Sequence, residues 1–276
     1  MKKGISAWAF VDKDLKVVFP KAKQYGFEGV ELALDFSGPV RPDSTNEELD
    51  EIKALAKEYG VELYSVASGC YWGMSMTADD PEQRAQTEEL VKKQIDIAAY
   101  LGCDSILILP GLVAGFDKNG PKVPYDVVYA RALEAVKRLA PYAEEKKVKI
   151  GLENVWNKFL LSPLEMRDFI DAVGSDYVGC YFDVGNVMQT GYPEHWIRIL
   201  GNRIVKVHYK DFKLDIGNIS GFCDLLEGDV DYPEVQKAFK EVGYDNWVTA
   251  EVFPDPADPE KILTVNSAAM DRILSY

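Results

Sequence analysis

Four side chains that can bind a metal ion or move a proton stand late in four consecutive apolar segments of the chain: Glu153, Asp183, His208 and Glu251. A carboxylate in such a place must be solvated, paired or bound to a metal, because burying it bare is costly. Three carboxylates and one imidazole form an oxygen-rich set. This set suits Mn²⁺, Mg²⁺ or Co²⁺ better than a thiolate-binding metal, and Zn²⁺ stays open on ligand type.

Short β-type segments alternate with longer helical patterns along the 276 residues. The predicted strands are Gly4–Ala9, Gly29–Leu34, Glu62–Ala67, Ser105–Pro110, Lys149–Asn154, Val178–Asp183, Ile204–Lys210 and Trp247–Val252. The clearest predicted helices are Thr45–Tyr59, Pro81–Leu101, Asp126–Lys146, Pro233–Val242 and Pro259–Leu274. Eight strand–helix units predict an α/β fold, a single (β/α)₈ TIM barrel over residues 1–276. A doubly wound open sheet is the alternative, but its Gly-rich phosphate loop is absent from the sequence.

A closed barrel explains how the four side chains can meet. Barrel enzymes carry their chemistry at the C-terminal ends of the strands, and consecutive strands are neighbours. Glu153, Asp183, His208 and Glu251 can therefore converge on one point. As a ligand, His208 must be neutral, and we expect its other N–H to donate to a nearby acceptor.

Further residues near the strand ends are candidates for contact with a substrate. Lys210 follows His208 by two positions and shares its face of the strand, where it could hold a hydroxyl or phosphate or pair with a carboxylate of the set. Asn186 could bind a hydroxyl or serve only as a turn residue after Gly185. The remaining candidates are aromatic or polar residues at the predicted barrel mouth: Trp8, Trp72, Trp156, Glu31 and Ser68.

Composition argues against several classes of protein. The net charge is −14, from 31 basic and 45 acidic residues, so we expect no nucleic-acid partner. No apolar run approaches the ~18 residues of a transmembrane helix, so we expect no membrane partner. The four cysteines are widely spaced and form no CxxC pair, which predicts reduced thiols in a cytoplasmic protein.

The chain resembles the xylose isomerase-like TIM-barrel superfamily, in its sugar and sugar-phosphate isomerase/epimerase branch. The motifs that carry the resemblance are Leu152-Glu153-Asn154, Asp183-Val-Gly-Asn186, His208-Tyr-Lys210-Asp211, Glu227-Gly-Asp-Val-Asp-Tyr232 and Thr249-Ala-Glu251. The resemblance implies one divalent ion, usually Mn²⁺, held by Glu153, Asp183, His208 and Glu251. It also implies that Glu153 and Glu251 exchange protons with the substrate. Members are often dimers or tetramers, which leaves a homodimer or homotetramer open.

The same resemblance implies an isomerase that acts on a small sugar or sugar phosphate. The Asp183 and His208 motifs look like those of L-xylulose and L-ribulose 5-phosphate 3-epimerases. The segment after Glu153 also looks like D-tagatose and D-psicose 3-epimerases, but Asn186 and Leu214 stand where those enzymes carry His and Arg. Two histidines and an acidic surface argue against endonuclease IV, which shares the fold.

We expect a 3-epimerase of a ketose or ketose phosphate that works through a metal-stabilised enediolate. In this chemistry one glutamate removes a proton and the other returns one to the opposite face. A hydroxypyruvate-type or aldose–ketose isomerase and an inosose-type dehydratase could use the same site. A non-catalytic sugar-binding barrel is the alternative from another class, but it has no need of two bases.

Overall fold

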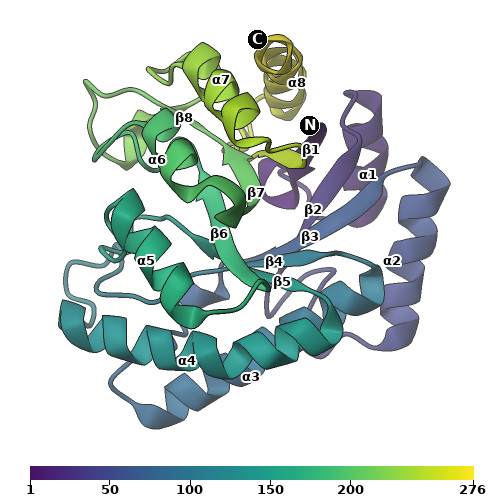
Figure 1. The fold of residues 1–276 in the computed structure, drawn as a ribbon. Helices are drawn as coiled ribbons and strands as arrows, with labels where there is room; N and C mark the ends of the chain where they lie inside the picture. The colour runs from purple at the N-terminus through teal and green to yellow at the C-terminus, as the bar shows by residue number, and fades with distance from the viewer.

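The computed structural model describes residues 1–276, which form a closed barrel of eight parallel strands (Figure 1). Around the barrel the strands run in the order β1, β10, β7, β6, β5, β4, β3, β2. Their bounds are β1 Lys2–Ser6, β2 Gly29–Leu34, β3 Glu62–Ser68, β4 Ser105–Ile108, β5 Lys149–Glu153, β6 Val178–Asp183, β7 Ile204–Tyr209 and β10 Trp247–Ala250. The predicted (β/α)₈ barrel is confirmed.

Eight helices surround the strands (Figure 1). Their bounds are α1 Leu15–Gln24, α2 Asn46–Tyr59, α3 Pro81–Leu101, α4 Tyr125–Lys146, α5 Pro163–Val173, α6 Pro193–Leu200, α7 Tyr232–Val242 and α8 Pro259–Ser275. Local chemistry sets these limits. In α3 and α5 a proline occupies the first turn, directly after Asp80 or Ser162, whose side chain accepts a backbone N–H. After α2 and α3 the chain reverses through Gly60 and Gly102, both in the left-handed region that glycine tolerates best.

Most predicted limits of strands and helices differ from the observed ones by at most two residues, and two differences are larger. The first strand ends at Ser6 rather than Ala9, because Ala7–Ala9 turns into a short 3₁₀ helix whose Trp8 N–H donates to Ser6 Oγ. A two-stranded antiparallel sheet of β8 (Asp211–Phe212) and β9 (Phe222–Cys223) was not predicted. Strands of two residues are too short to leave a pattern of alternation in a sequence.

Large polar side chains fill the inside of the barrel beneath the ends of the strands. A Cβ on Gly4 would lie 2.2 Å from the Tyr64 hydroxyl, and one on Gly151 would lie 2.7 Å from Cδ2 of Tyr181. These two glycines therefore leave the space that the two tyrosine rings occupy. Tyr64 Oη lies 2.8 Å from Thr249 Oγ1, so this interior is hydrogen-bonded across the barrel.

None of the helices combines the length and the apolar character that crossing a membrane requires. All four cysteines are free thiols.

Candidate metal centre

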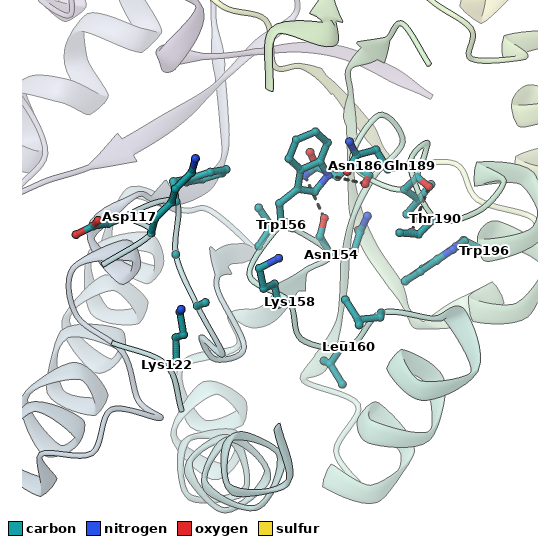
Figure 2. Close-up of a pocket in the computed structure, with 17 residues that line it drawn as sticks. Asp117, Lys122, Asn154, Trp156, Lys158, Leu160, Asn186, Gln189, Thr190 and Trp196 are labelled. Carbon is teal, nitrogen blue, oxygen red and sulfur yellow. Dashed lines mark hydrogen bonds between the residues drawn. The ribbon is translucent and has the colours of Figure 1, made fainter. Parts of the chain in front are cut away.

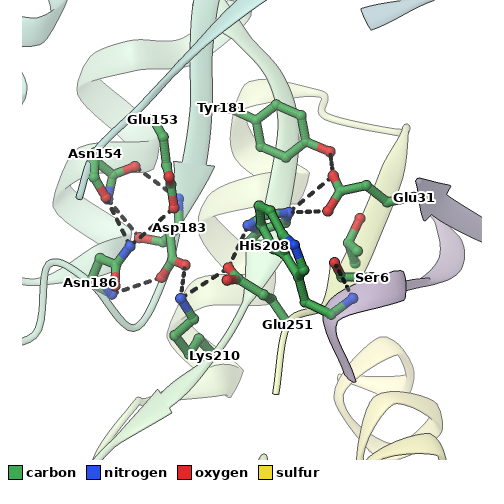
Figure 3. Close-up of polar contacts among 12 residues, drawn as sticks. Ser6, Glu31, Glu153, Asn154, Tyr181, Asp183, Asn186, His208, Lys210 and Glu251 are labelled. Atoms are coloured by element: carbon green, nitrogen blue, oxygen red, sulfur yellow. Dashed lines mark hydrogen bonds and ion pairs between the residues drawn. The ribbon is translucent and has the colours of Figure 1, made fainter. Parts of the chain in front are cut away.

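The four side chains singled out in the sequence meet at the C-terminal mouth of the barrel (Figure 3). Glu153, Asp183 and His208 stand at or near the ends of β5, β6 and β7, and Glu251 directly follows β10. These strands are consecutive around the barrel, so Glu153 and Glu251 lie three strands apart. One ligand atom from each residue lies within 4.8 Å of the others. Asp183 and His208 are fully buried.

The cluster fits a divalent cation in both size and chemistry. Metal–ligand bonds of about 2.0–2.2 Å place two ligands of one ion at most about 4.4 Å apart, close to the observed limit. Three buried atoms of the cluster have charged or polar neighbours but form no hydrogen bond of good geometry: Asp183 Oδ2, His208 Nδ1 and Glu251 Oε2. A buried polar atom without a partner costs about 1–3 kcal/mol. A bound cation would satisfy all three atoms at once.

His208 is oriented for ligation through Nδ1. Its Nε2 lies 2.9 Å and 3.1 Å from the two carboxylate oxygens of Glu31, and an ionised carboxylate only accepts, so Nε2 carries the proton. The neutral ring then presents a lone pair at Nδ1, which lies 2.7 Å from Glu251 Oε2. Burial lowers the pKa of His208, but the charges of Glu31 and Glu251 outweigh it and hold the pKa well above its usual value. A proton therefore competes with a metal ion at Nδ1.

Glu31 lies beneath the cluster, although the sequence suggested a place at the barrel mouth. It is completely buried, and its carboxylate receives hydrogen bonds from His208 and from the Tyr181 hydroxyl (Figure 3). Tyr181 is a supporting residue that the sequence reasoning missed. The signal was its position two residues before Asp183, on the same face of β6.

Two asparagines hold the carboxylates in place. Asn154 donates from Nδ2 to the Asp183 carbonyl and accepts the Asp183 N–H at Oδ1, each at 2.8 Å. Asn186 donates its backbone N–H to Asp183 Oδ1 at 2.7 Å and its side-chain amide to Glu153 Oε1 at 3.3 Å. The intervening Gly185 is required because a Cβ there would lie 2.7 Å from the Lys210 carbonyl oxygen. Asn186 is thus both a turn residue and a support for Glu153.

Lys210 is the positive charge of the centre. Its Nζ lies 2.9 Å from Glu251 Oε2 and 3.1 Å from Asp183 Oδ2. Burial and the nearby Glu251 charge raise the pKa of Glu153 to about 8. Burial also acts to raise the pKa of Glu251, but Lys210 and His208 outweigh it and hold that pKa below its usual value. The two glutamates therefore differ sharply in electrostatic environment.

A cavity of about 130 Å³ opens above the cluster. Glu153 and Glu251 line this cavity, whereas Asp183 and His208 do not. The predicted contact residues that line it are Trp8, Ser68, Trp72, Trp156, Asn186 and Lys210. Glu31 is not among the lining residues. Phe116, Phe222 and Phe253 also line the cavity, and they come from loops and from the two-residue strand β9, which carry no pattern in the sequence.

The segment from Lys210 to Tyr232 is folded around one buried carboxylate. Asp211 accepts the N–H groups of Phe212, Leu226 and Val230. A Cβ on Gly228 would lie 2.2 Å from Asp211 Oδ1, so only glycine fits there. This explains two of the sequence motifs structurally and places Phe222 beside Lys210, whose Nζ lies 5.2 Å from the centre of the Phe222 ring.

Comparison with known proteins identifies relatives over almost the whole chain. An uncharacterized protein of Methanocaldococcus jannaschii, MJ1311, is 24% identical over 263 residues, 91% of this chain and 83% of that protein. An L-ribulose-5-phosphate 3-epimerase of Salmonella paratyphi A is 23% identical over 240 residues, 86% of this chain and 81% of that protein.

A crystal structure of D-psicose 3-epimerase with D-tagatose, from Clostridium cellulolyticum H10, shares the fold with a TM-score of 0.84. It is 20% identical and the match covers 99% of each chain. The family model described as xylose isomerase-like TIM barrel matches residues 19–272. The chain therefore belongs to the xylose isomerase-like TIM barrel family.

Proposed function

We propose that this protein is a divalent-metal-dependent 3-epimerase of a ketose or ketose phosphate. The observation that carries the proposal is the division of the cluster: only Glu153 and Glu251 reach the cavity, while Asp183 and His208 stay beneath them. An inversion needs two proton-transferring groups that both touch the substrate. The relatives that act as L-ribulose-5-phosphate 3-epimerase and D-psicose 3-epimerase support the choice of reaction.

Glu153, Asp183, His208 and Glu251 would hold one divalent ion. We propose Mn²⁺ as the ion, with Mg²⁺, Co²⁺ and Zn²⁺ as the alternatives. When bound, such an ion polarises the substrate carbonyl and stabilises the negative charge that develops on its oxygen. Glu31 keeps His208 in the tautomer that leaves Nδ1 free to bind. Asn154 fixes the backbone of Asp183 from both sides.

The two glutamates transfer the protons. Glu153 and Glu251 stand three strands apart around the barrel mouth, so a sugar between them presents one face to each. One carboxylate removes the proton from the carbon beside the carbonyl, and the other delivers a proton to the opposite face of that carbon. The configuration is inverted, and the pair must exchange its proton with solvent before the next turnover in the same direction.

The remaining lining residues position the sugar. Trp8 and Trp156 offer aromatic walls for the apolar faces of a sugar. Lys210, held by Asp183 and Glu251, presents a fixed positive charge to substrate oxygens. Asn186 anchors Glu153 and offers polar contact at the same wall.

Removal of the metal tests the proposal. We expect protein treated with EDTA to lose more than 100-fold in 3-epimerase turnover and to regain it when Mn²⁺ is added. We also expect Mn²⁺ to raise the melting temperature of the stripped protein, since a ligand that binds only the folded state stabilises it. Metal content, turnover and thermal melting are measured on the same samples. Full turnover in protein shown to be free of metal would contradict the proposal.

A further inference from the structure

A second and larger cavity, of about 520 Å³, shares part of its lining with the cavity of the metal centre. Figure 2 shows the residues that line the larger cavity. Four residues line both cavities and form the boundary between them: Phe116, Val155, Trp156 and Asn186. Trp156 is fixed at this boundary because its indole N–H donates to the Asn186 carbonyl at 2.9 Å. The two cavities are therefore adjacent, and the proposed chemistry does not use the larger one.

The second cavity is positively charged in a protein whose net charge is −14. Lys118, Lys122 and Lys158 line it, and Asp117 is the single carboxylate among the lining residues. All the lysine ion pairs of the structure involve other lysines. The cavity therefore carries an excess of two positive charges with no internal partner, which matches the charge of a phosphate monoester, about −2.

The loops that carry these lysines are held together. Asn157, fully buried, donates from Nδ2 to the Gly111 carbonyl at 2.7 Å and accepts the Val113 N–H at its backbone oxygen at 3.1 Å. The loop after β5 is thereby fastened to the loop after β4. The next residue, Lys158, has a φ of 59°, a left-handed conformation that a residue with a side chain adopts only at a cost. The hydrogen bonds of the buried Asn157 hold this conformation, which sets the position from which the Lys158 side chain enters the cavity (Figure 2).

We propose that this cavity binds the phosphate group of a phosphorylated ketose whose reacting carbons lie at the metal centre. The proposal rests on the proposed function for the position of the sugar. Lysine binds phosphate as a point charge on a flexible stem that can reach toward its ligand. A bound dianion would bring the summed charge of Lys118, Lys122, Lys158 and Asp117 close to neutral. The protein then selects ketose phosphates over free ketoses.

Two unreactive ligands test this selection, ribitol and ribitol 5-phosphate, because neither has a carbonyl group. Calorimetry on the Mn²⁺-loaded protein at low salt gives both dissociation constants. We expect ribitol 5-phosphate to bind at least tenfold more tightly. In a Lys122→Met, Lys158→Met double variant we expect the ratio of the two constants to fall to near one. Lys57→Met removes an exposed charge at the end of α2, outside both cavities, and is expected to keep the ratio.

Three results would overturn the inference: equal affinities in the unmodified protein, an unchanged ratio in the double variant, or inorganic phosphate binding as tightly as ribitol 5-phosphate. The last would make the cavity an anion site unconnected with a sugar. No turnover is needed for these measurements. The protein could prefer ribitol 5-phosphate over ribitol, lose that preference in the double variant, and yet epimerise no ketose. That result would support the inference and would contradict only the proposed function.

Discussion

Glu153→Gln and Glu251→Gln are each expected to lower turnover by at least about 10³-fold while the protein stays folded. Glutamine keeps the shape of the side chain but cannot accept a proton, and general acid–base catalysis alone contributes about 10²–10⁴-fold. Each variant also loses a charged ligand of the proposed ion. Turnover is measured with Mn²⁺ raised until metal content equals that of the unmodified protein. This separates the loss of a ligand from the loss of a base.

The two variants should also differ in which epimer they act on. Each glutamate serves one face of the substrate, so a variant that lacks one base should still remove the proton from the epimer that presents its hydrogen to the other. Solvent deuterium would then enter that epimer without net inversion. Glu145→Gln, an exposed change at the end of α4, is the matched control and should be near normal. Near-normal turnover in either active-site variant would rule out its assigned role.

Lys210→Met is expected to destabilise the metal-free protein by about 3–5 kcal/mol, because removing one partner of a buried ion pair leaves the other charges uncompensated. Lys210 is the shared counter-charge of Asp183 and Glu251, both largely buried. Urea unfolding of the EDTA-treated protein measures this loss. Mn²⁺ should restore much of it, since an ion at 100 times its dissociation constant adds about 2.7 kcal/mol.

Lys206→Met is the matched control for that experiment. Lys206 is also buried and lies on β7, four residues before Lys210, but its Nζ pairs with Asp104 at 2.7 Å, away from the metal centre. We expect this variant to be destabilised without a greater response to Mn²⁺ than the unmodified protein has. If Mn²⁺ stabilises the two lysine variants equally, Lys210 does not act as the counter-charge of the metal ligands.

The barrel and the meeting of its four side chains could be predicted because both leave simple marks in the sequence. An apolar run that ends in a carboxylate or imidazole places that group at the strand end, and the closed topology brings consecutive strand ends together. The order of β5, β6, β7 and β10 around the barrel then determines that Glu153 and Glu251 stand apart.

The contacts that support the four residues could not be predicted. The pattern of a strand shows which side chains point into the barrel, but it does not show how far below the barrel mouth each one lies. Glu31 and Tyr181 both point into the barrel, but the space left by Gly151 decides that they meet beneath His208. The lysines of the second cavity lie on loops without periodicity, which are joined by hydrogen bonds such as that from Asn157 to Gly111. Long-range contacts of this kind depend on loop geometry that local propensity does not encode.

Deuterium exchange tests the central claim most directly. The Mn²⁺-loaded protein is incubated in D₂O with a set of ketoses and ketose 5-phosphates, and NMR follows deuterium at each carbon. The proposed 3-epimerase predicts deuterium at C3 together with the C3 stereoisomer. Deuterium at C1 or C2 with a moved carbonyl would indicate an isomerase instead, and loss of water a dehydratase. No exchange in any sugar, with the metal shown to be bound, would contradict the account and favour a sugar-binding barrel.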